Sequence, residues 1–97
     1  MTYPALHELM RSYLHQDYDL IGSIDDNVDQ FLRDFDHLAP LLPDDVARLL
    51  ASVADDDEIR ITVEEMGCQL RPVGGTYRAW LQQIADRVRA KTGTADR

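Results

Sequence analysis

The chain has 97 residues, 44% of them hydrophobic, and a formal net charge of −8. This length suggests one domain over residues 1–97, which buries roughly two-thirds of its unfolded surface without covalent cross-links. Acidic side chains outnumber basic ones by 18 to 10. This excess argues against nucleic-acid binding, because phosphate contacts need lysine and arginine together on one face.

The charge is also unevenly distributed along the chain. Residues 1–58 contain 14 acidic and 3 basic side chains, a net of −11, whereas residues 59–97 contain 4 and 7, a net of +3. An acidic half attracts cations, metal ions or basic proteins. It also has a simpler interpretation, since acidic surfaces keep proteins in solution.

Cysteine content and hydropathy indicate a cytoplasmic protein. The single cysteine, Cys68, excludes a disulfide within the chain, which fits a reducing compartment. No apolar run approaches the roughly 20 residues of a membrane span. The N-terminus lacks a basic region followed by an apolar one, so we expect no signal peptide.

The first predicted helix runs from Pro4 to about His15. Proline suits the first helical position because its missing N–H would be unpaired there anyway. Apolar side chains follow at helical spacing. They are Leu6, Leu9, Met10, Tyr13 and Leu14.

A break at Gly22 precedes the second predicted helix. Ser23 is a typical N-cap residue, and Asp25 and Asp26 would then lie in the first turn, where acidic side chains favour the helix dipole. The buried face would consist of Val28, Phe31, Leu32 and Phe35.

The third predicted helix begins near Pro43, with Asp44 and Asp45 in its first turn. Its apolar stripe consists of Val46, Leu49, Leu50 and Val53.

The fourth segment is ambiguous. Ile59, Val63 and Met66 fit helical spacing, but Ile59, Ile61 and Val63 fit the alternation of a strand. We favour a helix, because Gly67 stands where a helix C-terminus needs a left-handed residue.

Thr76 would cap a final helix. The apolar side chains of that helix at core spacing are Tyr77, Trp80, Leu81, Ile84 and Val88. Residues 93–97 should fray. The sequence therefore predicts a single small all-α domain, a bundle of about five helices.

No pattern in the sequence predicts a metal site or another cofactor site. The run Asp17-x-Asp19-x-x-Gly22 resembles the start of a calcium-binding loop, but Ile21 and Val28 occupy positions that need oxygen ligands. The three histidines have no partner at three or four residues' spacing, and Cys68 is alone. We expect neither a metal nor a cofactor.

Catalysis is likewise not predicted. Cys68 lacks a surrounding nucleophile turn, and a lone cysteine is usually a small buried hydrophobe. The turn at residues 74–76 lacks the context of a phosphate-binding loop. His15 and Asp17 are two residues apart and would not face each other on a helix. We therefore expect a protein that is not an enzyme.

The segment "YPALHELMRSYLHQDYDLIGSIDDNVDQF" resembles the opening of a small helical group of immunity proteins from contact-dependent growth inhibition systems. The specific part is the block from Tyr13 to Asp19, and a looser similarity recurs at Gly67 and at Trp80-Leu81. One departure is Tyr18, where tryptophan is expected more often; tyrosine keeps the aromatic ring but not the indole N–H.

The resemblance implies a cytoplasmic protein that binds the toxic C-terminal domain of a delivered effector. Many such toxins are nucleases with basic surfaces, and a strongly acidic inhibitor suits them through steered association. The free protein would be a monomer or weak dimer. The alternative is an acidic regulatory or adaptor module that binds another protein without neutralising a toxin.

Two acidic clusters compete as the partner-binding site. The first acidic cluster comprises Asp17, Tyr18, Asp19, Asp25, Asp26 and Asp29; the second comprises Asp55, Asp56, Asp57 and Glu58. We favour the first, because it is larger and includes an aromatic side chain that can anchor a partner. Acidic side chains in the second can simply stabilise the start of the fourth helix.

Overall fold

The computed structural model describes residues 3–14, 22–70, 72 and 75–92. These residues form five α-helices and one short 3-10 helix, without a strand, which confirms the all-α prediction. The elements are α1 (Pro4–Ser12), α2 (Ile24–Asp34), η2 (Ala39–Leu41), α3 (Leu42–Ser52), α4 (Asp56–Glu65) and α5 (Tyr77–Thr92). None of the described helices is both long and apolar enough to span a membrane.

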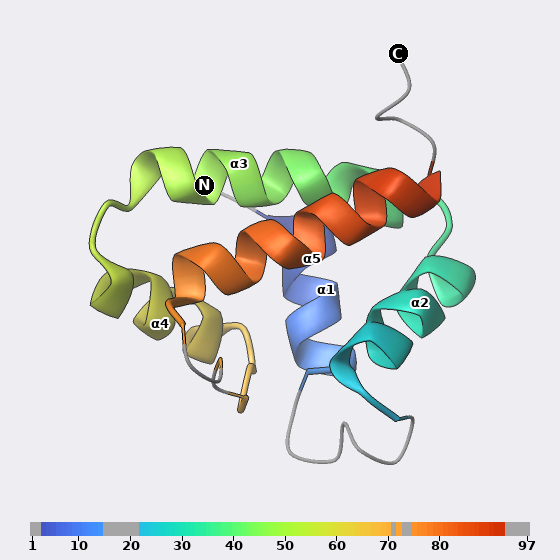
Figure 1. The fold of residues 1–97 in the computed structure, drawn as a ribbon, viewed down its shortest axis with the longest axis horizontal. Helices are drawn as coiled ribbons and strands as arrows, with labels where there is room; N and C mark the ends of the chain where they lie inside the picture. The colour runs from blue at the N-terminus through green and yellow to red at the C-terminus, as the bar shows by residue number, and fades with distance from the viewer. Residues whose placement is uncertain (1–2, 15–21, 71, 73–74, 93–97) are drawn as a thin grey trace.

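The longest helix, α5, packs against most of the other elements. It packs along α3, and it also contacts α4, α2 and η2. Figure 1 shows α4 and α2 on opposite sides of the molecule, with α3 and α5 stretched between them. All five apolar side chains predicted for the buried stripe of α5 are indeed buried: Tyr77, Trp80, Leu81, Ile84 and Val88.

A cluster of three aromatic side chains joins the end of α1 to α2. The ring of Tyr13 meets those of Phe31 and Phe35 edge-on, with centroid distances of 5.8 and 6.2 Å. Its hydroxyl donates to Oδ2 of Asp34 at 2.5 Å. The helix α1 ends at Ser12, with Tyr13 as its C-cap residue, three residues before the predicted end at about His15, which lies outside the described residues.

The fourth segment is the helix α4, as predicted, and its buried side chains show why. Ile59 and Val63 are four residues apart and fully buried, whereas Ile61 between them is 46% exposed. A strand would place all three on one face. Gly67 follows with φ of 108°, and a Cβ atom there would lie 3.2 Å from the backbone of Arg11.

The third helix starts one residue earlier than predicted and is preceded by a turn that the sequence pattern did not predict. The 3-10 helix η2 leads directly into α3, which begins at Leu42 and has Pro43 in its first turn. Proline there leaves no intrahelical hydrogen bond unmade. As a result, the chain reverses from α2 to α3 within a few residues.

We predict that Trp80→Ala destabilises the fold strongly. Trp80 is 8% exposed and packs edge-on against Tyr77, so removing the indole leaves a cavity beneath the first turn of α5. The free energy of unfolding should fall by roughly 3–5 kcal/mol, measured by urea denaturation. Leu41→Ala is the control: at 48% exposed, it should change that free energy by less than about 0.5 kcal/mol. Equal effects of the two variants would contradict the placement of Trp80.

Candidate functional site

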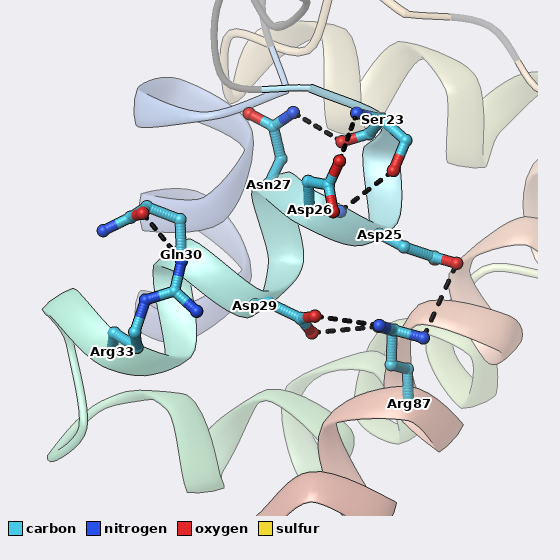
Figure 2. Close-up of polar contacts among 8 residues, drawn as sticks. All are labelled: Ser23, Asp25, Asp26, Asn27, Asp29, Gln30, Arg33 and Arg87. Carbon is cyan, nitrogen blue, oxygen red and sulfur yellow. Dashed lines mark hydrogen bonds and ion pairs between the residues drawn. The ribbon is translucent and has the colours of Figure 1, made fainter.

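Half of the first acidic cluster lies at the start of α2. Asp25, Asp26 and Asp29 project from the first two turns of this helix, and Figure 2 shows them together. Asp17, Tyr18 and Asp19 lie outside the described residues, so their place beside α2 stays a prediction.

Ser23 caps α2, as predicted, and Asp26 completes the cap. The Ser23 hydroxyl accepts from the backbone N–H of Asp26 at 3.1 Å, and the Asp26 carboxylate accepts from the N–H of Ser23 at 3.0 Å (Figure 2). This capping box satisfies two N–H groups that the helix leaves unpaired. Gly22, with φ of 144°, allows the approach, because a Cβ there would collide with the Asp26 carboxylate. The Asp26 side chain therefore has a structural task.

Asp29 forms a two-pronged ion pair with Arg87 of α5. The guanidinium Nε and Nη2 donate to its two oxygens at 3.0 and 2.8 Å, and Nη1 lies 3.5 Å from Asp25 (Figure 2). These bonds hold the pKa of Asp29 below its ordinary value. Sequence patterns did not predict the pairing, because Arg87 is 58 residues away. The only hint was the opposite net charge of the two parts of the chain.

The outward part of this cluster is Asp25. Its side chain is 67% exposed, whereas that of Asp29 is 24% exposed. Arg87 faces the carboxylates of Asp25 and Asp29, and the charges of Arg33 and Lys91 also act on Asp29, so the exposed negative charge of the site lies mainly on the side of Asp25. Such an arrangement presents negative potential to solvent and attracts a cationic group of a partner.

The second acidic cluster is partly used in capping helices. Asp55 accepts from the N–H of Asp57 at 3.1 Å and so caps α4. Asp56 accepts from the N–H groups of Tyr77 and Arg78 at 3.1 and 3.0 Å, and so caps α5 from a different helix. Asp57 and Glu58 are exposed.

A hollow of about 290 Å³ lies between α2, η2 and the end of α5. Its lining residues are Asp29, Leu32, Arg33, Asp36, Ala39, Pro40, Lys91 and Thr92. Two acidic and two basic side chains balance each other in this lining. The hollow therefore favours neither sign of charge in a ligand.

The residues considered for catalysis and metal binding are dispersed. Cys68 is 3% exposed, and burial raises the pKa of its thiol, which makes it a poor nucleophile. Thr76 accepts from the N–H of Ala79 at 3.0 Å and so caps α5, as predicted. In the part of the chain that the structure describes, no three histidine, cysteine or acidic side chains are placed to hold a metal ion. His15 lies outside that part.

A protein-family model described as CdiI immunity protein matches residues 2–88, most of the chain. The chain belongs to the CdiI immunity protein family. The family resemblance seen at residues 3–31 is thereby confirmed. No curated protein and no solved structure matches the chain.

Membership in the CdiI family gives the acidic surface a context. Immunity proteins of contact-dependent growth inhibition systems act by binding a cognate toxin and neutralising it. The relevant chemistry is thus that of a protein–protein interface, for which exposed carboxylates such as that of Asp25 are suited.

We predict that Arg87→Gln lowers the free energy of unfolding, and that this deficit becomes smaller as the pH falls. With Arg87 present, the folded pKa of Asp29 lies below its ordinary value of 3.8. A depressed carboxyl pKa contributes stability above the unfolded pKa and loses it as the pH falls through the folded pKa. Urea unfolding at pH 7, 4 and 3 should therefore show the deficit of the variant shrinking below about pH 3.8. A deficit that is constant from pH 7 to pH 3 would contradict this account of Asp29.

Proposed function

We propose that this CdiI protein neutralises the toxic C-terminal domain of a delivered effector, and that this toxin is a basic nuclease. The observation that carries the proposal is the net charge of −8. A nuclease holds a polyanion and needs a basic surface to do so. An acidic inhibitor competes for that surface directly.

The proposed mode of action is stoichiometric binding in the cytoplasm, without catalysis. Cys68 is the one cysteine of the chain, and its burial suits packing rather than reaction. The exposed acidic side chains act together instead, as a surface that accelerates encounter with an oppositely charged partner.

We propose that the first acidic cluster captures the toxin. Asp25 and Asp26 contribute exposed carboxylates in the described part, and Asp17, Tyr18 and Asp19 would extend the same surface. Asp26 and Asp29 hold the start of α2 in place through Ser23 and Arg87. Their contribution to binding is the negative charge that remains after this pairing.

Co-expression with the cognate toxin domain tests the function. We predict that this protein restores growth and co-purifies with the toxin in a 1:1 ratio. Cys68→Ser should protect equally well, because a buried thiol with a raised pKa takes no part in chemistry. Failure of the unaltered chain to bind the toxin would refute the proposed function. Loss of protection by a folded Cys68→Ser variant would refute the mode of action without catalysis.

Asp25→Lys tests the capture surface: it removes an exposed carboxylate and its 3.5 Å ion pair with Arg87, but leaves the Ser23 and Asp29 side chains unaltered. We predict that association with the toxin domain slows by roughly threefold and depends less on salt, because exposed charges act mainly on the encounter rate. Stopped-flow measurements at two salt concentrations would show both effects. Asp44→Lys is the matched control, since Asp44 lies in the first turn of α3 and its side chain is 81% exposed. A larger effect of Asp44→Lys would place the capture surface elsewhere.

A further inference from the structure

The outward face of α4 carries one apolar side chain among four carboxylates. Its five exposed residues are Asp57, Glu58, Ile61, Glu64 and Glu65. These positions repeat at i, i+1, i+4, i+7 and i+8, so they form one stripe along the helix. The opposite side of α4 is buried through Ile59 and Val63. We refer to the exposed stripe as the Ile61 face.

Ile61 is a β-branched side chain that the fold does not use. It is 46% exposed, and with Leu41 it is one of two large apolar side chains in the described chain that are exposed to this extent. A single exposed apolar residue is common in proteins. Here, however, it stands at the centre of a charged ring, which is the arrangement of an anchor with a polar rim.

Two of the four charges around Ile61, Asp57 and Glu58, lie in the first turn of α4 and favour its dipole, but the other two do not. Glu64 and Glu65 end α4, where the helix dipole is negative, and the last turn contains no basic side chain. Arg60 pairs with Glu64 at 3.2 Å. Within the described residues, no ion pair is recorded for Glu65. A locally unfavourable residue of this kind is characteristic of a surface kept for function.

We propose that the Ile61 face is the part of the interface that holds the toxin once it is captured. This inference rests on the proposed function. The occupant is a basic face of the toxin in which an apolar depression receives Ile61 and surrounding lysine or arginine side chains meet the carboxylates. A second copy of this chain fits poorly, because it would bring two sets of four carboxylates together.

Ile61→Ala tests the anchor, because alanine keeps the helix and removes only the exposed apolar side chain. The probe is the purified, catalytically inactivated cognate toxin domain, measured by surface plasmon resonance. Dissociation should become roughly tenfold faster with little change in association. Leu41→Ala, which removes an equally exposed apolar side chain from another face, should stay within about twofold of the unaltered chain.

Glu65→Gln separates a binding role from a structural one. Removing this charge from the helix C-terminus should raise the melting temperature by about 2 °C, while association with the same toxin domain becomes slower. If Glu65 had only a structural role, the variant would change the melting temperature but not the rate of association with the toxin domain.

Three results would overturn the inference. One is Ile61→Ala with wild-type dissociation, whether or not Leu41→Ala releases the toxin. Another is Glu65→Gln with unchanged association. The third is a wild-type dimer in sedimentation that only Ile61→Ala dissociates, which would make a second copy the occupant. If the unaltered chain fails to bind the toxin at all, the proposed function itself fails; if it binds and one of these three results is found, only the role of the Ile61 face fails.

Discussion

The buried carboxylate of Asp45 fixes how the start of α1 packs against α3. It lies on α3 but accepts from the N–H groups of Ala5 and Leu6 at 2.8 and 3.2 Å, and so caps α1, whose own N-cap residue makes no side-chain cap. Asp45 is 1% exposed, and Arg48 pairs with it. Leaving a buried charge without such partners would cost several kcal/mol. Since a helix of 9 residues is marginal alone in water, this contact between helices decides whether α1 forms in place.

The start of α5 is likewise capped by a carboxylate from another helix. Asp56 of α4 accepts from the first two N–H groups of α5, and Thr76 accepts from the third. In return, Arg78 of α5 donates to the carbonyls of Leu50 and Val53 at the end of α3, at 3.2 and 2.6 Å. Acidic side chains thus hold helix N-termini and an arginine holds a C-terminus, as the helix dipole favours. Several charged side chains of this protein therefore stabilise the fold by capping helices.

The helices could be predicted from the sequence because their signals are local. Helical spacing, the Ser23 cap and the Gly67 stop each lie within one or two turns, and all three are confirmed. The contacts that orient the helices join residues 40, 21 and 58 positions apart, such as Asp29 with Arg87. No local pattern selects which arginine meets which aspartate. For the same reason, the sequence did not separate structural carboxylates such as Asp26 from exposed ones such as Asp25.

The difference between structural and exposed carboxylates matters for how an acidic surface binds a partner. A carboxylate already held by an arginine, like Asp29, offers a partner only part of its charge. An exposed one that has no ion pair among the described residues, like Glu65, offers nearly all of it, although salt screens it. Exposed charges speed encounter more than they strengthen a complex, so a lasting complex also needs apolar area that excludes water. In the described chain, Ile61 provides such area within a ring of carboxylates. The proposal thus assigns attraction and retention to different residues, which makes the two separable by mutation.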